Sequence, residues 1–143
     1  MRRLLLPILL LLAAPAAAQP REPEWRQATE HPVLLRVNAF EPQEIRLVAG
    51  QPTRLVFYNS SRVPLSLHAG RFFENARIRS GDADLVANGG MILGPSETRA
   101  VSLVPGPGRY RLRSRSWFRR LIGMSAVIIV EPAGRTAGQL VRP

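Results

Sequence analysis

The sequence lacks cysteine, and its 143 residues include only two histidines, His31 and His68. Without cysteine the chain cannot form disulfides, thiolate metal sites, a cysteine nucleophile or a lipid attachment through an N-terminal cysteine. No pair of carboxylates stands in a shared motif, so a catalytic triad or dyad would have to be built on His68 alone. We therefore expect that the protein is not an enzyme.

Lysine is also absent, so that all 20 basic residues are arginines. Only 10 residues are acidic, and the formal net charge of +10 gives a surface that attracts anions. Hydrophobic residues make up 45% of the chain and charged residues 21%, which is typical of a globular protein. The length allows one small domain.

Residues 1–18 have the pattern of a cleavable signal peptide. Arg2 and Arg3 give a positive start, an apolar run covers residues 4–14, and small residues end at Ala18. Prolines interrupt the apolar run, which is shorter than the roughly 20 residues that a membrane-spanning helix needs. We expect a periplasmic or secreted protein that does not span a membrane; an uncleaved anchor is the alternative.

From residue 33 onward, short runs rich in leucine and β-branched residues are separated by proline and glycine, a pattern typical of strands joined by turns. The predicted strands cover residues 33–39, 44–48, 53–59, 65–68, 98–103, 109–116 and 124–131. Seven strands fit an all-β Greek-key β-sandwich, which we assign to residues 33–131. A flexible arm, residues 19–32, precedes the sandwich, and a flexible tail, residues 132–143, follows it. The long loop 69–90 contains one predicted helical turn at 72–76.

Side chains alternate between the two faces of a strand, and residues 109–116 show this most clearly. One face carries Arg109, Arg111, Arg113 and Arg115, and the other carries Tyr110, Leu112, Ser114 and Ser116. Ser114 is therefore expected to point inward. The continuous apolar run 127–130 predicts a strand that is covered on both faces.

Several short motifs follow one another in a recurring order. They are Phe40-x-Pro42-x-Glu44-Ile45, Gly50-x-Pro52, Asn59 with His68 nine residues later, Gly94-Pro95-Ser96-Glu97-Thr98, Pro107-Gly108-x-Tyr110 and Gly123-Met124. Gly50 suits the positive φ of a tight turn, and a tyrosine at the corner before a strand commonly bonds back to the backbone. In this order the motifs resemble the cupredoxin-like family of blue-copper fold, and in particular the EfeO-type domains of exported bacterial proteins.

The resemblance implies a copper site whose ligands are largely missing here. It places His68 at the first histidine, Ser114 at the cysteine and Met124 at the methionine, whereas the second histidine falls near Ser116 or Trp117. A hydroxyl cannot replace the thiolate that a type-1 copper centre requires, so an ordinary blue site is excluded.

Two interpretations of this degenerate metal site remain. In the first, the protein is an exported accessory or binding module without a cofactor, in which His68 is a surface residue and Met124 fills the core. In the second, it is a periplasmic copper-handling protein that binds copper through His68 and Met124, with Met91 as a further candidate.

Six arginines lie within 12 residues of one another. They are Arg109, Arg111, Arg113, Arg115, Arg119 and Arg120, with Trp117 and Phe118 among them. Arginine has a planar fork suited to carboxylate and phosphate. We expect this face to bind a periplasmic protein with an acidic surface or an anionic lipid surface, the alternative being a merely solvated face. Nucleic acid is not expected as a partner because the chain is exported and lacks a stacking platform.

Overall fold

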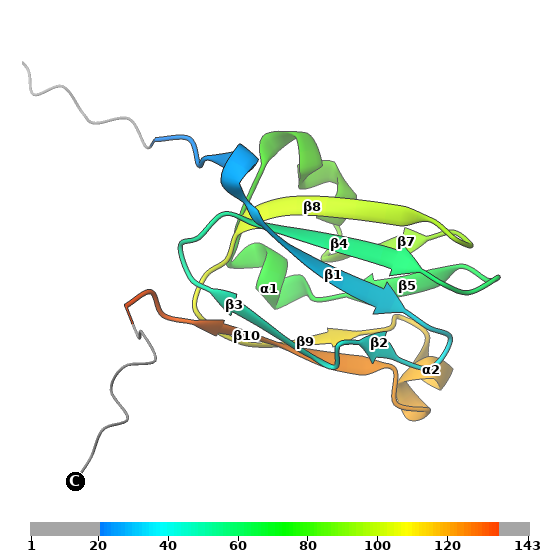
Figure 1. The fold of residues 1–143 in the computed structure, drawn as a ribbon. Helices are drawn as coiled ribbons and strands as arrows, with labels where there is room; N and C mark the ends of the chain where they lie inside the picture. Colours follow the sequence, from blue (N-terminus) through cyan, green and yellow to red (C-terminus); the bar gives the residue numbers. More distant parts are fainter. Residues whose placement is uncertain (1–20, 135–143) are drawn as a thin grey trace, which may run out of the picture.

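The computed structural model describes residues 21–134, which fold into two sheets packed face to face (Figure 1). The first sheet contains, in spatial order, β2 (Phe40–Glu41), β1 (Thr29–Leu35), β4 (Thr53–Asn59), β8 (Thr98–Val104) and β6 (Arg77–Ile78). The second contains β3 (Glu44–Val48), β10 (Ser125–Glu131), β9 (Gly108–Arg113), β5 (Leu65–His68) and β7 (Gly90–Leu93). The helical segments are the 3-10 turns η1 (Trp25–Gln27) and η2 (Ser80–Val86) and the short helices α1 (Gly70–Glu74) and α2 (Trp117–Leu121).

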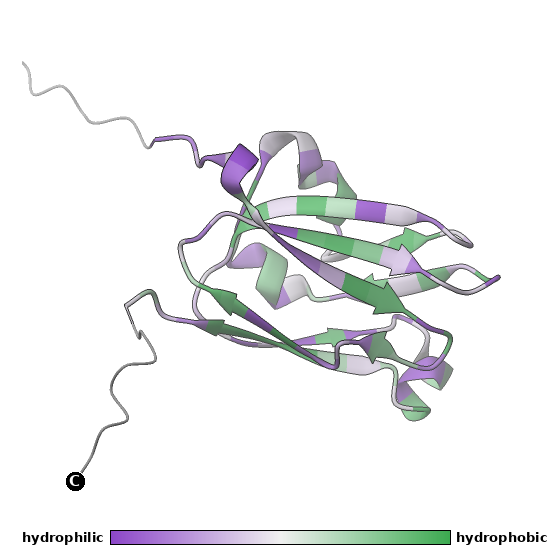
Figure 2. Cartoon of the chain, in the orientation of Figure 1, coloured by the Kyte–Doolittle hydropathy of each residue, from purple (hydrophilic) through white to green (hydrophobic). Residues whose placement is uncertain are grey.

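The core lies between the sheets and follows from strand alternation. On β4, Leu55 and Phe57 are buried between exposed Arg54 and Tyr58, and β10 buries Ile128 and Val130 in the same way. Figure 2 shows these apolar stretches along the strands of both layers. β1 pairs with β4 and β3 with β10 in parallel, and the other pairs of strands are antiparallel.

The predicted β-sandwich is confirmed, but its described part has ten strands instead of about seven. β2 and β6 have two residues each, too few to show a period of two. β7 directly follows Gly89 and has only three apolar residues. The sequence alone does not distinguish such a short run from the end of the predicted loop 69–90.

β1 begins at Thr29, within the predicted flexible arm, and ends at Leu35 instead of residue 39. Its early start has a tertiary cause, because Thr29 to Leu35 pair in register with Thr53 to Asn59 of β4. Pro32 is tolerated in this strand since β2 pairs only with Leu34 and Leu35, so that no neighbour on that side needs its missing N–H.

The predicted loop 69–90 is an ordered segment with structure of its own. The helical turn expected at 72–76 is present two residues earlier, as α1, and Phe72 packs edge-on against Tyr110 with 5.5 Å between ring centroids. η2 is fastened to β8, where the Ser102 N–H donates to Asp82 Oδ2 at 2.9 Å.

Two turn features confirm the sequence interpretation. Gly50 has a φ of 78°, and the Tyr110 hydroxyl donates to the carbonyls of Gly106 at 3.0 Å and Pro107 at 2.9 Å. The predicted signal peptide, residues 1–18, and residues 135–143 of the predicted tail lie outside the described residues. Within residues 21–134, no helix is long and apolar enough to cross a membrane.

Buried and charged hydrogen bonds hold the turns at one end of the sandwich. The fully buried Asn59 amide donates to the carbonyls of Val63 at 2.8 Å and Gly94 at 2.9 Å, which joins the β4–β5 and β7–β8 turns. At the second of these turns, the Glu97 carboxylate accepts the Gly94 N–H and the Arg99 Nε–H. These contacts, first the backbone N–H and then the guanidinium, hold the pKa of Glu97 below its ordinary value.

Candidate binding face and the position of the copper ligands

Ser114 and Met124 lie opposite each other on the inner face of the second sheet. Ser114 follows the last residue of β9, and its N–H points to the Met124 carbonyl at 3.4 Å. The Ser114 side chain is buried, with 1% exposed, and its hydroxyl oxygen accepts the Ser116 N–H at 3.3 Å. Met124 is completely buried. The inward orientation predicted for Ser114 is therefore confirmed, and Met124 is part of the core.

His68 lies on the opposite face of the same sheet. It ends β5 directly opposite Arg113, and both residues are exposed. Its imidazole lies against glycine backbone: a Cβ at Gly89 would be 2.7 Å from His68 Cε1, and one at Gly70 would be 3.2 Å from Nε2. The structure therefore does not bring His68 together with Met124 and Ser114, because the thickness of the sheet lies between them.

The remaining candidate ligand also points inward. Met91 is buried on β7, opposite Leu67 of β5. No group of three or more His, Asp or Glu side chains within residues 21–134 is placed to hold a metal ion.

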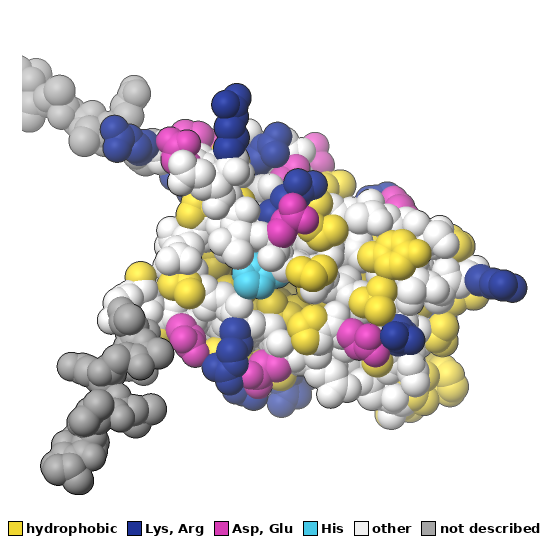
Figure 3. All heavy atoms as spheres, in the orientation of Figure 1, with side chains coloured by type: hydrophobic (Ala, Val, Ile, Leu, Met, Phe, Trp, Pro, Cys, Tyr) yellow, Lys and Arg dark blue, Asp and Glu magenta, His cyan; other side chains and the backbone are white. Residues whose placement is uncertain are grey.

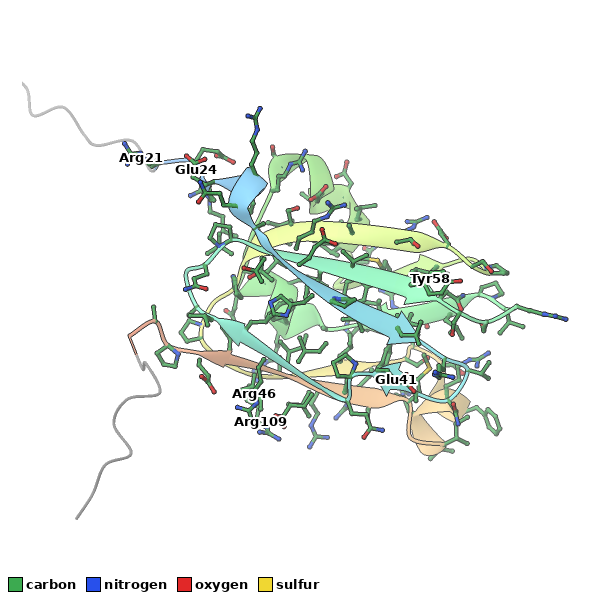
Figure 4. The ribbon with its side chains drawn as sticks, viewed as in Figure 1. Arg21, Glu24, Glu41, Arg46, Tyr58 and Arg109 are labelled. Atoms are coloured by element: carbon green, nitrogen blue, oxygen red, sulfur yellow. The ribbon has the colours of Figure 1, made fainter. Side chains whose placement is uncertain are left out.

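The outer face of the second sheet carries a row of arginines on β9. At the lower edge of the molecule in Figure 3, basic side chains gather beside acidic ones. Arg109, Arg111 and Arg113 project from β9, and Figure 4 shows Arg109 and Arg46 pointing away from the sandwich on the side of β9, β10 and β3. Facing them on β10 are, in register, Ile129, Val127 and Ser125. Together with Arg120 of α2, these three arginines and residues 125–127 line a surface groove of about 710 Å³, which we call the arginine groove.

The four arginines of this groove have no carboxylate partner among the described residues. The ion pairs of residues 21–134 use Arg36, Arg46, Arg54, Arg77 and Arg99. Glu44 and Glu131, the carboxylates of the neighbouring strands β3 and β10, both contact Arg46, at 2.6 and 3.0 Å. Glu74 of α1 lines an adjoining pocket with Arg109, Arg111 and Arg113, but it forms no ion pair with them. Arginines outnumber carboxylates on this face, which therefore keeps a net positive charge.

The structure divides the six arginines predicted to form one face into two groups. Arg115 donates to the Asn88 carbonyl at 2.8 Å, and Arg119 donates to the Val37 carbonyl at 2.9 Å. These two side chains hold loops in place, and neither lines the arginine groove. The other four remain available to a ligand.

The floor of the groove is partly apolar. Val127 and Ile129 on the outer face of β10 are half-buried, so the prediction that residues 127–130 are covered on both faces is wrong. Their neighbours in register include Arg109 and Arg111 on β9 and Arg46 on β3, whose aliphatic stems can cover apolar surface.

Sequence reasoning missed the helix α2 in the predicted loop between the last two strands. Three of its apolar side chains are exposed: Phe118 by 58%, Leu121 by 74% and Ile122, directly after the helix, by 45%. The signal was present as Trp-Phe-Arg-Arg-Leu-Ile, a run without proline or glycine between Ser116 and Gly123. The side chain of Trp117 lies outside the described part of the chain.

No protein-family model matches the chain, and no curated protein matches its sequence significantly. Solved structures do match. Dithionite-reduced auracyanin from Roseiflexus castenholzii has a TM-score of 0.52 at 17% identity, over 73% of this chain and 98% of that chain. Auracyanin B has a TM-score of 0.52 at 18% identity, over 80% of this chain and 94% of that chain.

Auracyanin A from Chloroflexus aurantiacus, described as a "blue" copper protein, has a TM-score of 0.51 at 16% identity, over 73% of this chain and 99% of that chain. At such identities the likeness concerns the fold and not the chemistry. The absence of cysteine and of a ligand cluster in the described residues is consistent with a degenerate metal site. By its structure, the chain has the cupredoxin fold of the auracyanins.

Proposed function

We propose that this protein is an exported cupredoxin-like binding module that does not carry electrons and that binds an anionic partner through the arginine groove. The observation that carries the proposal is the placement of side chains on β9. Ser114, directly after the strand, is buried and its N–H donates to the Met124 carbonyl, whereas Arg109, Arg111 and Arg113 point outward and form no ion pair in the described structure.

The inner face offers poor chemistry for copper. A type-1 centre needs a thiolate and two imidazoles in one plane, with a weak thioether on the axis. Ser114 supplies a neutral hydroxyl that already accepts the Ser116 N–H, and Met124 supplies a thioether within the core. The alternative of a copper-handling site made by His68 and Met124 is less well supported, because their side chains leave the sheet on opposite faces.

A binding role is favoured over a catalytic one because no carboxylate orients the imidazole. His68 is exposed beside Arg113, and although Glu74 of α1 lines the same surface pockets, neither a hydrogen bond nor an ion pair joins it to His68 in the described residues. The likeness of the motifs to EfeO-type domains of exported bacterial proteins, with the leader-like residues 1–18, supports a periplasmic or secreted location.

A copper titration tests the first half of the proposal. Purified protein is titrated with Cu(I) against a competing chelator and with Cu(II) in the spectrophotometer. We expect neither stoichiometric binding nor an intense visible band. One copper bound per chain, lost in both His68→Ala and Met124→Leu, would replace this proposal with the copper-handling one.

Retention on immobilised polyglutamate tests the second half. We expect salt-dependent retention that decreases in the double variant Arg111→Glu with Arg113→Glu. The matched control is Arg26→Glu with Arg62→Glu, which changes the net charge equally at exposed positions outside the groove. Equal weakening in both variants would show that net charge alone causes retention and would exclude the groove as the binding face.

A further inference from the structure

The helix α2 gives the molecule an exposed apolar projection next to the arginine groove. Leu121 has 74% of its surface exposed, Phe118 58% and Ile122 45%. Val37, 48% exposed, is held beside this helix because its carbonyl accepts a hydrogen bond from Arg119. We call these four side chains the α2 tip.

The α2 tip and the arginine groove belong to one side of the molecule. Arg120 is part of α2 and also lines the groove with Arg113 and Ser125. Figure 1 shows α2 projecting beyond β10 at one end of the second sheet, on the side away from the first sheet. Apolar side chains that protrude at the edge of a basic surface are the arrangement of proteins that lie on an anionic bilayer.

We propose that this side of the molecule docks on a bilayer containing anionic phospholipids. Arg109, Arg111, Arg113 and Arg120 bind headgroup phosphates, and Leu121, Ile122 and Phe118 enter the boundary between headgroups and acyl chains. The inference rests on the proposed function, since the same groove serves both, and it specifies the partner.

The chemistry of the groove fits phosphate. A guanidinium presents parallel N–H donors to the oxygens of a phosphate, and arginine at every second position of a strand repeats at about 7 Å. Basic side chains near an anionic leaflet each contribute to binding, and the contributions add along a cluster. The four groove arginines and Arg46 outnumber the carboxylates of Glu44, Glu74 and Glu131, so the face stays net positive and attracts anionic headgroups.

The shape of the α2 tip favours a bilayer over an acidic protein. Leu121 and Ile122 are exposed at the end of α2 and line neither of the two described grooves to which Arg109, Arg111 and Arg113 contribute. A protein partner would need a cavity shaped to receive them, whereas a fluid interface accommodates any convex apolar surface. The five-residue length of α2, with Arg119 and Arg120 in its last turn, suits shallow insertion.

Co-sedimentation with vesicles tests the inference. The probes are vesicles of phosphatidylcholine alone and of phosphatidylcholine with an equal amount of phosphatidylglycerol, at low and moderate salt. We expect binding only to the anionic vesicles, weakened by salt. Arg111→Glu with Arg113→Glu should reduce the partition coefficient by at least about 30-fold, since it removes two positive charges and adds two negative ones, and Leu121→Ser with Ile122→Ser about tenfold.

Matched control variants show whether binding depends on the arginine groove and the α2 tip or only on net charge and exposed apolar surface. Arg26→Glu with Arg62→Glu controls for net charge, and Tyr58→Thr removes an exposed aromatic side chain from the outer face of the first sheet. Both controls should bind nearly as the parent protein does. Thermal unfolding of every variant confirms that the fold is kept.

Each other outcome overturns a stated part of the argument. If the protein bound polyglutamate through Arg111 and Arg113 but did not bind vesicles, the partner would be an acidic protein. The proposed function would then stand. If the protein bound neither polyglutamate nor anionic vesicles, the proposed function would be refuted as well. Vesicle binding that is equally weakened by the charge control, or unaffected by the Leu121 and Ile122 substitutions, would refute docking by this surface.

Discussion

Substitution of Met124 distinguishes a core residue from a metal ligand. Its side chain has no exposed surface, so Met124→Ala leaves a cavity opposite Ser114 and should destabilise the fold by about 3 kcal/mol, within the range for buried methionine. For a domain of this size, the loss corresponds to a melting temperature about 12 °C lower. Met124→Leu keeps the volume and should cost less than about 1.5 kcal/mol.

Thermal unfolding of the two variants with and without Cu(I) gives the measurement. A core role predicts that copper shifts none of the melting curves and that only the alanine variant is strongly destabilised. A ligand role predicts that copper at about 100 times its dissociation constant stabilises the parent protein by about 2.7 kcal/mol. A stabilisation of this size that disappears in Met124→Leu would refute our assignment.

Three further changes test the packing around the same sheets. Glu97 has a lowered folded-state pKa, so it stabilises the fold above the ordinary glutamate pKa; Glu97→Gln should lower the urea midpoint near about pH 7 and have little effect near about pH 2. Gly90→Ala should destabilise strongly, because its Cβ would contact the Leu67 carbonyl oxygen, whereas Gly81→Ala meets nothing. Asn59→Ala should cost about 3 kcal/mol in urea unfolding, since several buried partners lose their hydrogen bonds.

The results that would contradict these predictions are equally concrete. If the urea midpoint of Glu97→Gln differed from that of the parent protein by the same amount at every pH, the charge of Glu97 would not be the cause of the difference. Equal melting temperatures for the two glycine variants would show that β5 and β7 can separate without loss. An unchanged midpoint for Asn59→Ala would mean that water replaces the lost donor.

The face of each residue on β9 could be predicted because side-chain alternation depends on the backbone alone. Arg109, Arg111 and Arg113 are outward and Ser114 inward, as the alternation requires. The same rule places His68 outside, since it follows the inward Leu65 and Leu67 on β5. The nine-residue spacing from Asn59 that suggested a ligand carries no information about which face the imidazole occupies.

Other features depend on contacts that distant segments make and leave no local pattern. The start of β1 at Thr29 is set by parallel pairing with β4, and the two residues of β6 are strand only because β8 lies beside them. The arginine groove needs α2 to bring Arg120 next to Arg113, which strand periodicity cannot show. Pairing between distant residues is the information that a short sequence window lacks.

The two faces of the β9–α2–β10 segment can change independently, so a cupredoxin fold does not require a cysteine on the inner face of this segment. Its inward residues, such as Leu112, Ser114 and Met124, are buried and determine packing. Outward positions such as Arg111 contact the solvent side only, so their side chains can become basic without disturbing the core. A binding face can therefore arise on this segment whether or not a thiolate remains on its inner side, since substitutions without shared partners have additive effects.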